Sequence, residues 1–132
     1  METKEQIEAL TKQELNNLGM RIQCSGFRYW IAAVTIALDY RINNTIDISI
    51  CNLYINIAKM FKSTQGRVER SLRYAREKLD VQKYFNVTYK IDNSVFLFLL
   101  MDKVEEKLKE GVNQWFANAA KKRLKTKKNI CT

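Results

Sequence analysis

The 132-residue sequence has no histidine and no proline, and it has only four glycines and three cysteines. The absence of histidine removes the commonest general base and the commonest metal ligand together. The glycines form no phosphate-binding loop, and the sequence has no Gly-x-Ser-x-Gly element and no carboxylate cluster with metal-ligand spacing. We therefore expect a protein that is not an enzyme and that needs no metal or other cofactor.

The three cysteines, Cys24, Cys51 and Cys131, are far apart and show no Cys-x-x-Cys spacing. An odd number of separated cysteines is typical of neither a disulfide framework nor a zinc knuckle. We expect reduced thiols that are mostly buried.

No stretch of the sequence is apolar enough to act as a secretory signal or to span a membrane. The first ten residues, METKEQIEAL, are polar. The longest apolar run, residues 95–101, is far shorter than the ~20 residues that cross a bilayer. We expect a cytoplasmic protein with no membrane partner, and we expect this run to lie in the core.

Positive charge is in excess and unevenly distributed. The sequence has 23 lysines and arginines against 14 aspartates and glutamates, which gives a net charge of +9. Residues 111–132 hold six of the basic residues and no acidic residue. Such a balance suits a polyanionic partner, either nucleic acid or an anionic membrane surface.

Apolar residues recur at helical spacing along almost the whole chain, which predicts an all-α fold. The first stripe stops at Gly19, a plausible helix C-cap. We expect further helices over residues 25–42 and 48–61, and one that begins at Asn93 or Ser94 and ends near Gly111. Residues 80–92 allow a short strand, but a helix end and a loop are the preferred interpretation.

The predicted architecture is one compact helical bundle of about six helices. We expect the domain to cover residues 1–120, with a last helix after residue 111 that docks through Trp115 and Phe116, and a basic tail over residues 121–132. Tail residues expected to contact phosphates are Lys121, Lys122, Arg123, Lys125, Lys127 and Lys128. A tail that only confers solubility is the simpler alternative, because six cations in eight residues stay solvated in either case.

Residues 48–79 fit a helix-turn-helix. Ala58 and Val68 are ten positions apart, which lets a small residue of the first helix and an apolar residue of the second share one core. Thr64 or Ser63 can cap the second helix. The turn lacks the glycine that this motif often contains.

The second helix of this motif presents a basic face. Val68, Leu72, Ala75 and Leu79 lie on one side at 100° per residue, so Arg70, Arg73 and Tyr74 point the other way, with Arg67 and Glu69 at the edges. Arginine can donate two hydrogen bonds to guanine, and glutamate can accept one from cytosine. Arg76 lies towards the far side, so we expect its loss to affect base preference little. From spacing alone, a solvated helix face fits equally well.

The stretch LYINIAKMFKSTQGRVERSLRYAREK resembles the C-terminal DNA-binding effector domain of the sporulation-initiation response regulator of endospore-forming Firmicutes. Asn93-Ser94-x-Phe96 and Leu18-Gly19 match the same family, and the resemblance covers roughly residues 7–108. It implies a six-helix fold whose recognition helix enters the major groove of short DNA boxes, often as tandem head-to-tail copies. It also gives Arg67, Glu69, Arg70 and Arg73 the family's DNA-contact roles. The full candidate set is Ser63, Thr64, Gln65, Arg67, Glu69, Arg70, Arg73 and Tyr74.

We therefore expect a sequence-specific, double-stranded DNA-binding transcriptional regulator associated with the nucleoid. The expected partners are DNA, a second copy of the chain on tandem sites, and RNA polymerase. Full-length family members carry an N-terminal receiver domain, whereas about six residues precede the resemblance here, so we expect a regulator without that domain. The alternatives are a protein-interaction module or antagonist that keeps the fold and, less favoured, a membrane-surface or nonspecific RNA binder acting through the tail.

Overall fold

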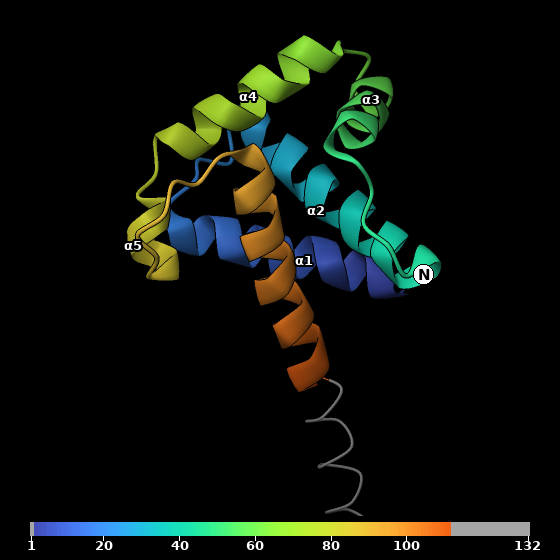
Figure 1. The fold of residues 1–132 in the computed structure, drawn as a ribbon, viewed down its shortest axis with the longest axis vertical. Helices are drawn as coiled ribbons and strands as arrows, with labels where there is room; N and C mark the ends of the chain where they lie inside the picture. Colours follow the sequence, from blue (N-terminus) through green and yellow to red (C-terminus); the bar gives the residue numbers. More distant parts are fainter. Residues whose placement is uncertain (1, 112–132) are drawn as a thin grey trace, which may run out of the picture.

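The computed structural model describes residues 2–111, which form helices joined by short turns, with no strand in that range (Figure 1). The helices are α1 (Glu2–Leu18), α2 (Ser25–Asn44), α3 (Ile50–Met60), α4 (Gln65–Glu77) and α5 (Val81–Phe85). A further helix over residues 93–111, orange in Figure 1, is called the C-terminal helix below. The expected all-α bundle of about six helices is confirmed.

Local chemistry sets several of the helix ends. Gly19 follows α1 with a left-handed φ of +92°, as its expected role as a C-cap requires. The hydroxyl of Ser49 caps α3 by accepting from the Asn52 amide at 3.3 Å. The hydroxyl of Thr64 caps α4 in the same way, by accepting from the Arg67 amide at 3.3 Å. Thr64 is thus the cap of the second helix, and Ser63 is not.

Two predictions for the second half of the chain were wrong. Residues 80–92 contain the separate helix α5, which is only five residues long and is capped by Asp80. The C-terminal helix is capped by Asp92, whose carboxylate accepts from the Val95 amide at 2.9 Å, and not by Asn93 or Ser94. A short helix shows no apolar periodicity, and three capping residues in a row leave the choice of cap to tertiary contacts.

The core lies between α2 and the other helices. Trp30 of α2 is 1% exposed and meets Phe96 of the C-terminal helix edge-on, with ring centroids 4.6 Å apart. The predicted core run in the C-terminal helix is buried at Phe96, Leu97 and Leu100, and Leu99 is half-buried. The expectation is wrong for Phe98, which is 42% exposed. None of the helices within residues 2–111 is long and apolar enough to cross a membrane.

Helix α4 crosses the N-terminal end of α2 at very short range (Figure 1). A Cβ atom built on Gly26 would lie 2.4 Å from the Ala75 Cβ and 2.7 Å from the Ser71 carbonyl oxygen. The Trp30 indole also donates to the Leu72 carbonyl of α4 at 3.0 Å. Only glycine allows this crossing, so residue 26 fixes where α4 sits on the bundle.

The buried carboxylate of Glu14 joins three helices: α1, α5 and the C-terminal helix. Glu14 of α1 has a side chain only 2% exposed, forms an ion pair with Lys107 of the C-terminal helix and accepts from the Tyr84 hydroxyl at 2.6 Å. Burial raises the pKa of Glu14, but hydrogen bonds from Lys107 and Tyr84 lower it by more, so the pKa lies below its ordinary value. Burial and the Glu14 hydrogen bond raise the pKa of Tyr84 to about 12.

The cysteines differ from expectation. Cys24 is half-buried and Cys51 is exposed, and both are free thiols. The expectation of mostly buried thiols is therefore wrong for Cys51, which lies in the first turn of α3. Cys131 lies outside the described residues, as do the predicted last helix with Trp115 and Phe116 and the basic tail.

Candidate DNA interface

Helices α3 and α4 form the predicted helix-turn-helix. Ala58 and Val68 are both buried, and the Ser63 amide donates to the Ala58 carbonyl at 2.8 Å to close the turn. The left-handed position that such a turn needs is taken by Lys62, with φ of +52°. A lysine therefore stands where this motif often has glycine.

The N-terminal half of α4 presents exposed polar side chains. Arg67 and Arg70 are exposed, and neither forms an ion pair or a side-chain hydrogen bond within the part of the chain that the structure describes. Gln65 is also exposed, and a Cβ atom built on Gly66 would meet nothing within 4 Å. Two guanidinium groups are thus free to bind an external partner.

Arg73 lies on the other edge of α4 and is held by its neighbours. Its Nε donates to the two Glu69 carboxylate oxygens at 3.1 and 3.4 Å, and its Nη1 lies 3.9 Å from a Glu77 oxygen. Its guanidinium also lies 5.0 Å from the ring centroid of Tyr74, which is 51% exposed. The hydrogen bond to Glu69 raises the pKa of Arg73, so the cation is present at any physiological pH.

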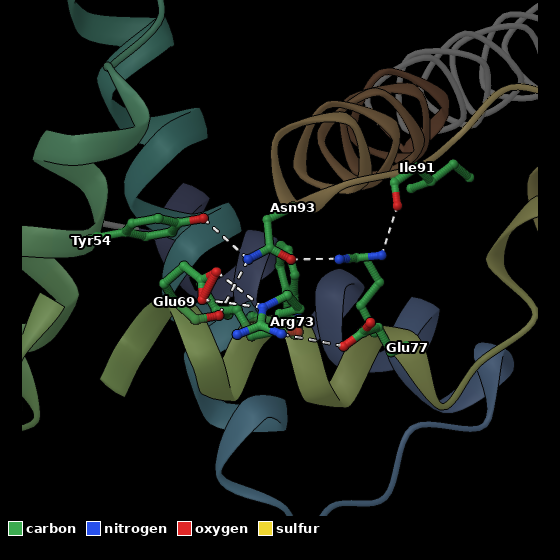
Figure 2. Close-up of polar contacts among 9 residues, drawn as sticks. Tyr54, Glu69, Arg73, Glu77, Ile91 and Asn93 are labelled. Atoms are coloured by element: carbon green, nitrogen blue, oxygen red, sulfur yellow. Dashed lines mark hydrogen bonds and ion pairs between the residues drawn. The ribbon is translucent and has the colours of Figure 1, made fainter. Parts of the chain in front are cut away.

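A buried amide fixes α4 against two other helices (Figure 2). Asn93 begins the C-terminal helix and is 7% exposed. Its Nδ2 donates to the Tyr54 hydroxyl of α3 at 3.2 Å and to the Glu69 carbonyl at 3.3 Å, and its Oδ1 accepts from the Arg76 Nε at 2.9 Å. Burial raises the pKa of Tyr54, so its hydroxyl stays neutral. Both helices of the helix-turn-helix are therefore tied to one side chain.

Arg76 has a structural role that the sequence did not reveal. Its Nη1 donates to the Ile91 carbonyl at 2.7 Å, in addition to the bond to Asn93. Arg76 does lie away from the exposed face, but its removal would break contacts that hold α4. It is therefore unsuitable as a neutral control for the other arginines.

The structure brings all eight predicted site residues to one region, the turn and α4. Their surroundings differ: Thr64 is engaged as a helix cap, Glu69 and Arg73 bind each other, and Ser63 is half-buried in the turn. The residues with freely exposed side chains are Gln65, Arg67, Arg70 and Tyr74. The sequence pattern missed Asn93 as a site-supporting residue, although a polar residue that begins an apolar helix was a visible signal.

Two helices joined by a tight turn, the second of which presents exposed arginines, are typical of helix-turn-helix DNA-binding domains. The family model described as the sporulation initiation factor Spo0A C terminal matches residues 11–104. The chain belongs to this family, which comprises DNA-binding effector domains of transcription regulation in sporulation. A search of curated proteins found no match.

Proposed function

We propose that the chain is a sequence-specific, double-stranded DNA-binding transcriptional regulator. The observation that supports this proposal most is the pair of exposed, unengaged arginines in the N-terminal half of α4, Arg67 and Arg70. The N-terminal half of a recognition helix is the part that meets base edges. Each arginine offers the paired donors that fit guanine O6 and N7.

Glu69 and Arg73 can also read bases if they give up their ion pair with each other for contacts with DNA. Their ion pair is 39% exposed on both sides, and exposed ion pairs contribute little to stability because water and salt screen them. A good bidentate base contact contributes about 1–3 kcal/mol. Loss of the ion pair therefore costs less than the contacts that can replace it, with Glu69 accepting from a cytosine and Arg73 donating to a guanine.

Further parts of the proposal concern partners. We infer that two copies bind tandem sites and that the bound protein contacts RNA polymerase, because the family acts in transcription. We infer no catalytic activity, since the family is one of DNA-binding domains. Measuring stoichiometry on a duplex with one site and on a duplex with two tandem sites tests this: a single copy bound to the duplex with two sites would contradict it.

We propose that the basic tail raises the affinity for DNA without changing the base preference. The six cations of residues 121–128 would add phosphate contacts, each of which steepens the salt dependence by about 0.9. Deleting residues 121–132 should weaken binding to all duplexes alike and flatten the plot of log affinity against log salt. Equal slopes for the full and shortened chains would show that the tail makes no phosphate contacts.

The central experiment is selection of bound sequences from a random duplex pool, followed by affinity measurements on the selected site and on one-base variants. An enriched short motif supports the proposal, whereas no enrichment would favour the protein-interaction alternative. Arg67→Ala should then reduce discrimination between the selected site and a one-base variant by about 1–3 kcal/mol, or about 5- to 150-fold. Glu69→Ala should relax a different base position.

The matched control is Lys4→Ala, which removes the same charge from an exposed position on α1. It should leave discrimination unchanged. If Arg67→Ala also leaves the discrimination between the selected site and a one-base variant unchanged, Arg67 does not read bases.

A further inference from the structure

The two long edges of α4 differ in charge. On one edge, Arg73 is neutralised by Glu69 and Glu77, the only acidic residues of α4. The other edge packs against the N-terminal end of α2, where no acidic residue occupies the first turn. Side chains of α2 and α4 meet there, and we call Ser25, Arg28 and Ser71 the α2 flank.

Packing holds the α2 flank in place. The Ser25 and Ser71 hydroxyl oxygens are 3.5 Å apart, directly beside the close crossing at Gly26. The Arg28 guanidinium lies 5.9 Å from the ring centroid of Phe61, the C-cap residue of α3, and the Tyr29 ring packs on Phe61 with ring centroids 4.9 Å apart. Arg28 therefore stands beside the turn of the helix-turn-helix although it belongs to α2.

Arg28 is exposed and forms no ion pair within residues 2–111. The positive charge continues along the same edge of α4. A hollow of about 490 Å³ is lined there by Ala75, which touches Gly26 at the crossing, and by the cations Arg21 and Lys78. This edge thus presents three cations and two hydroxyl groups without an acidic side chain among the residues that line it.

The orientation relative to the base-reading side chains is set by helix geometry. Arg67 and Ser71 are four residues apart, so they lie on the same side of α4. When Arg67 points to base edges in a major groove, the α2 flank faces the sugar-phosphate strand that borders the groove. The opposite edge carries Glu69 and Glu77, which disfavour a close phosphate.

We propose that the α2 flank is a phosphate-binding surface for one DNA strand, in which Arg28 contacts a phosphodiester oxygen and the Ser71 hydroxyl, which accepts from the Ser25 hydroxyl, donates to the same strand. Arg21 and Lys78 contact the next part of that backbone. This inference rests on the proposed DNA-binding function. It assigns a task to the N-terminal end of α2 that is separate from base reading: it fixes the register and the tilt of α4 on the duplex.

The test compares wild-type protein with Arg28→Ala on the selected duplex and on a one-base variant, over a range of salt concentrations. A phosphate contact contributes about 0.9 to the slope of log affinity against log salt. The loss of affinity between about 50 and about 200 mM salt should therefore be about 3.5-fold smaller for Arg28→Ala than for the wild type. Affinity should fall equally for both duplexes.

Two control variants accompany it. Arg28→Lys keeps the cation and should keep the slope. Lys4→Ala removes one charge from the start of α1, which lies near the C-terminal end of α2 and away from the flank, and it should also keep the slope (Figure 1). Thermal unfolding of each variant verifies that it is folded, and the exposed position of Arg28 predicts an unchanged midpoint.

The outcomes separate the two proposals. If the wild type binds with base preference but Arg28→Ala has the wild-type slope, the α2 flank is not a phosphate surface and the proposed function stands. If Arg28→Ala changes base preference, Arg28 reads bases and the inference is overturned. If the wild type binds no duplex, the proposed function fails first and the inference with it.

Discussion

Replacing Asn93 by alanine should destabilise the protein by about 2–4 kcal/mol. The side chain is 7% exposed and makes three hydrogen bonds. The two neutral bonds, to Tyr54 and to the Glu69 carbonyl, contribute about 1 kcal/mol each, and the bond from the Arg76 guanidinium contributes about 1.5–3 kcal/mol. Arg76 keeps its bond to the Ile91 carbonyl and is only half-buried. The loss of the hydrogen bond between Arg76 and Asn93 therefore costs an amount at the low end of that range.

The measurement is the free energy of unfolding from urea titration followed by circular dichroism. Tyr54→Phe removes one of the three partners and should cost about 1 kcal/mol, so the two variants form a graded pair. Asn56→Ala is the matched control, because Asn56 is exposed on α3 and its replacement should stabilise the helix by a few tenths of a kcal/mol. A loss below about 0.5 kcal/mol for Asn93→Ala would refute the idea that this amide holds α4 in place.

Three further predictions concern other parts of the fold. Gly26→Ala should destabilise by about 1–3 kcal/mol or more, because its Cβ would overlap Ala75 and the Ser71 carbonyl, and an unchanged unfolding midpoint would contradict the close crossing. Lys62→Gly should stabilise by about 0.5–1 kcal/mol, since the relief of a left-handed lysine, about 1–2 kcal/mol, exceeds the entropy cost of glycine; urea titration showing a less stable variant would count against this. The pKa of Glu14 is lowered in the fold, so its contribution to stability is present above the unfolded value of 4.5 and is lost as pH falls through the folded value. Unfolding free energies measured from neutral pH into this acid range should therefore fall less steeply for Glu14→Gln, and an acid limb identical to that of the wild type would exclude Glu14 as a contributor.

The sequence predicted those features whose causes are local. Helical spacing predicts the stripe of Val68, Leu72 and Ala75 and the exposed arginines, and the structure has both. Capping chemistry predicts either Thr64 or Ser63 as the cap of α4, and the structure has Thr64. The partners of polar side chains could not be predicted, because they come from elements far apart in the chain. Helical spacing places Arg76 away from the exposed face, and its structural role comes from Asn93 and Ile91, which lie 17 and 15 residues further along the chain.

The tryptophan at the centre of the bundle has a practical consequence. Trp30 is 1% exposed, and its indole nitrogen is bonded to the backbone of α4. Indole emission depends on the polarity around the ring and on its hydrogen bond, so this residue is an intrinsic fluorophore that contacts the buried side of α4. In a Trp115→Phe variant, the emission spectrum of Trp30 would report, without any attached label, whether α4 keeps its position when a ligand binds to the exposed face of this helix.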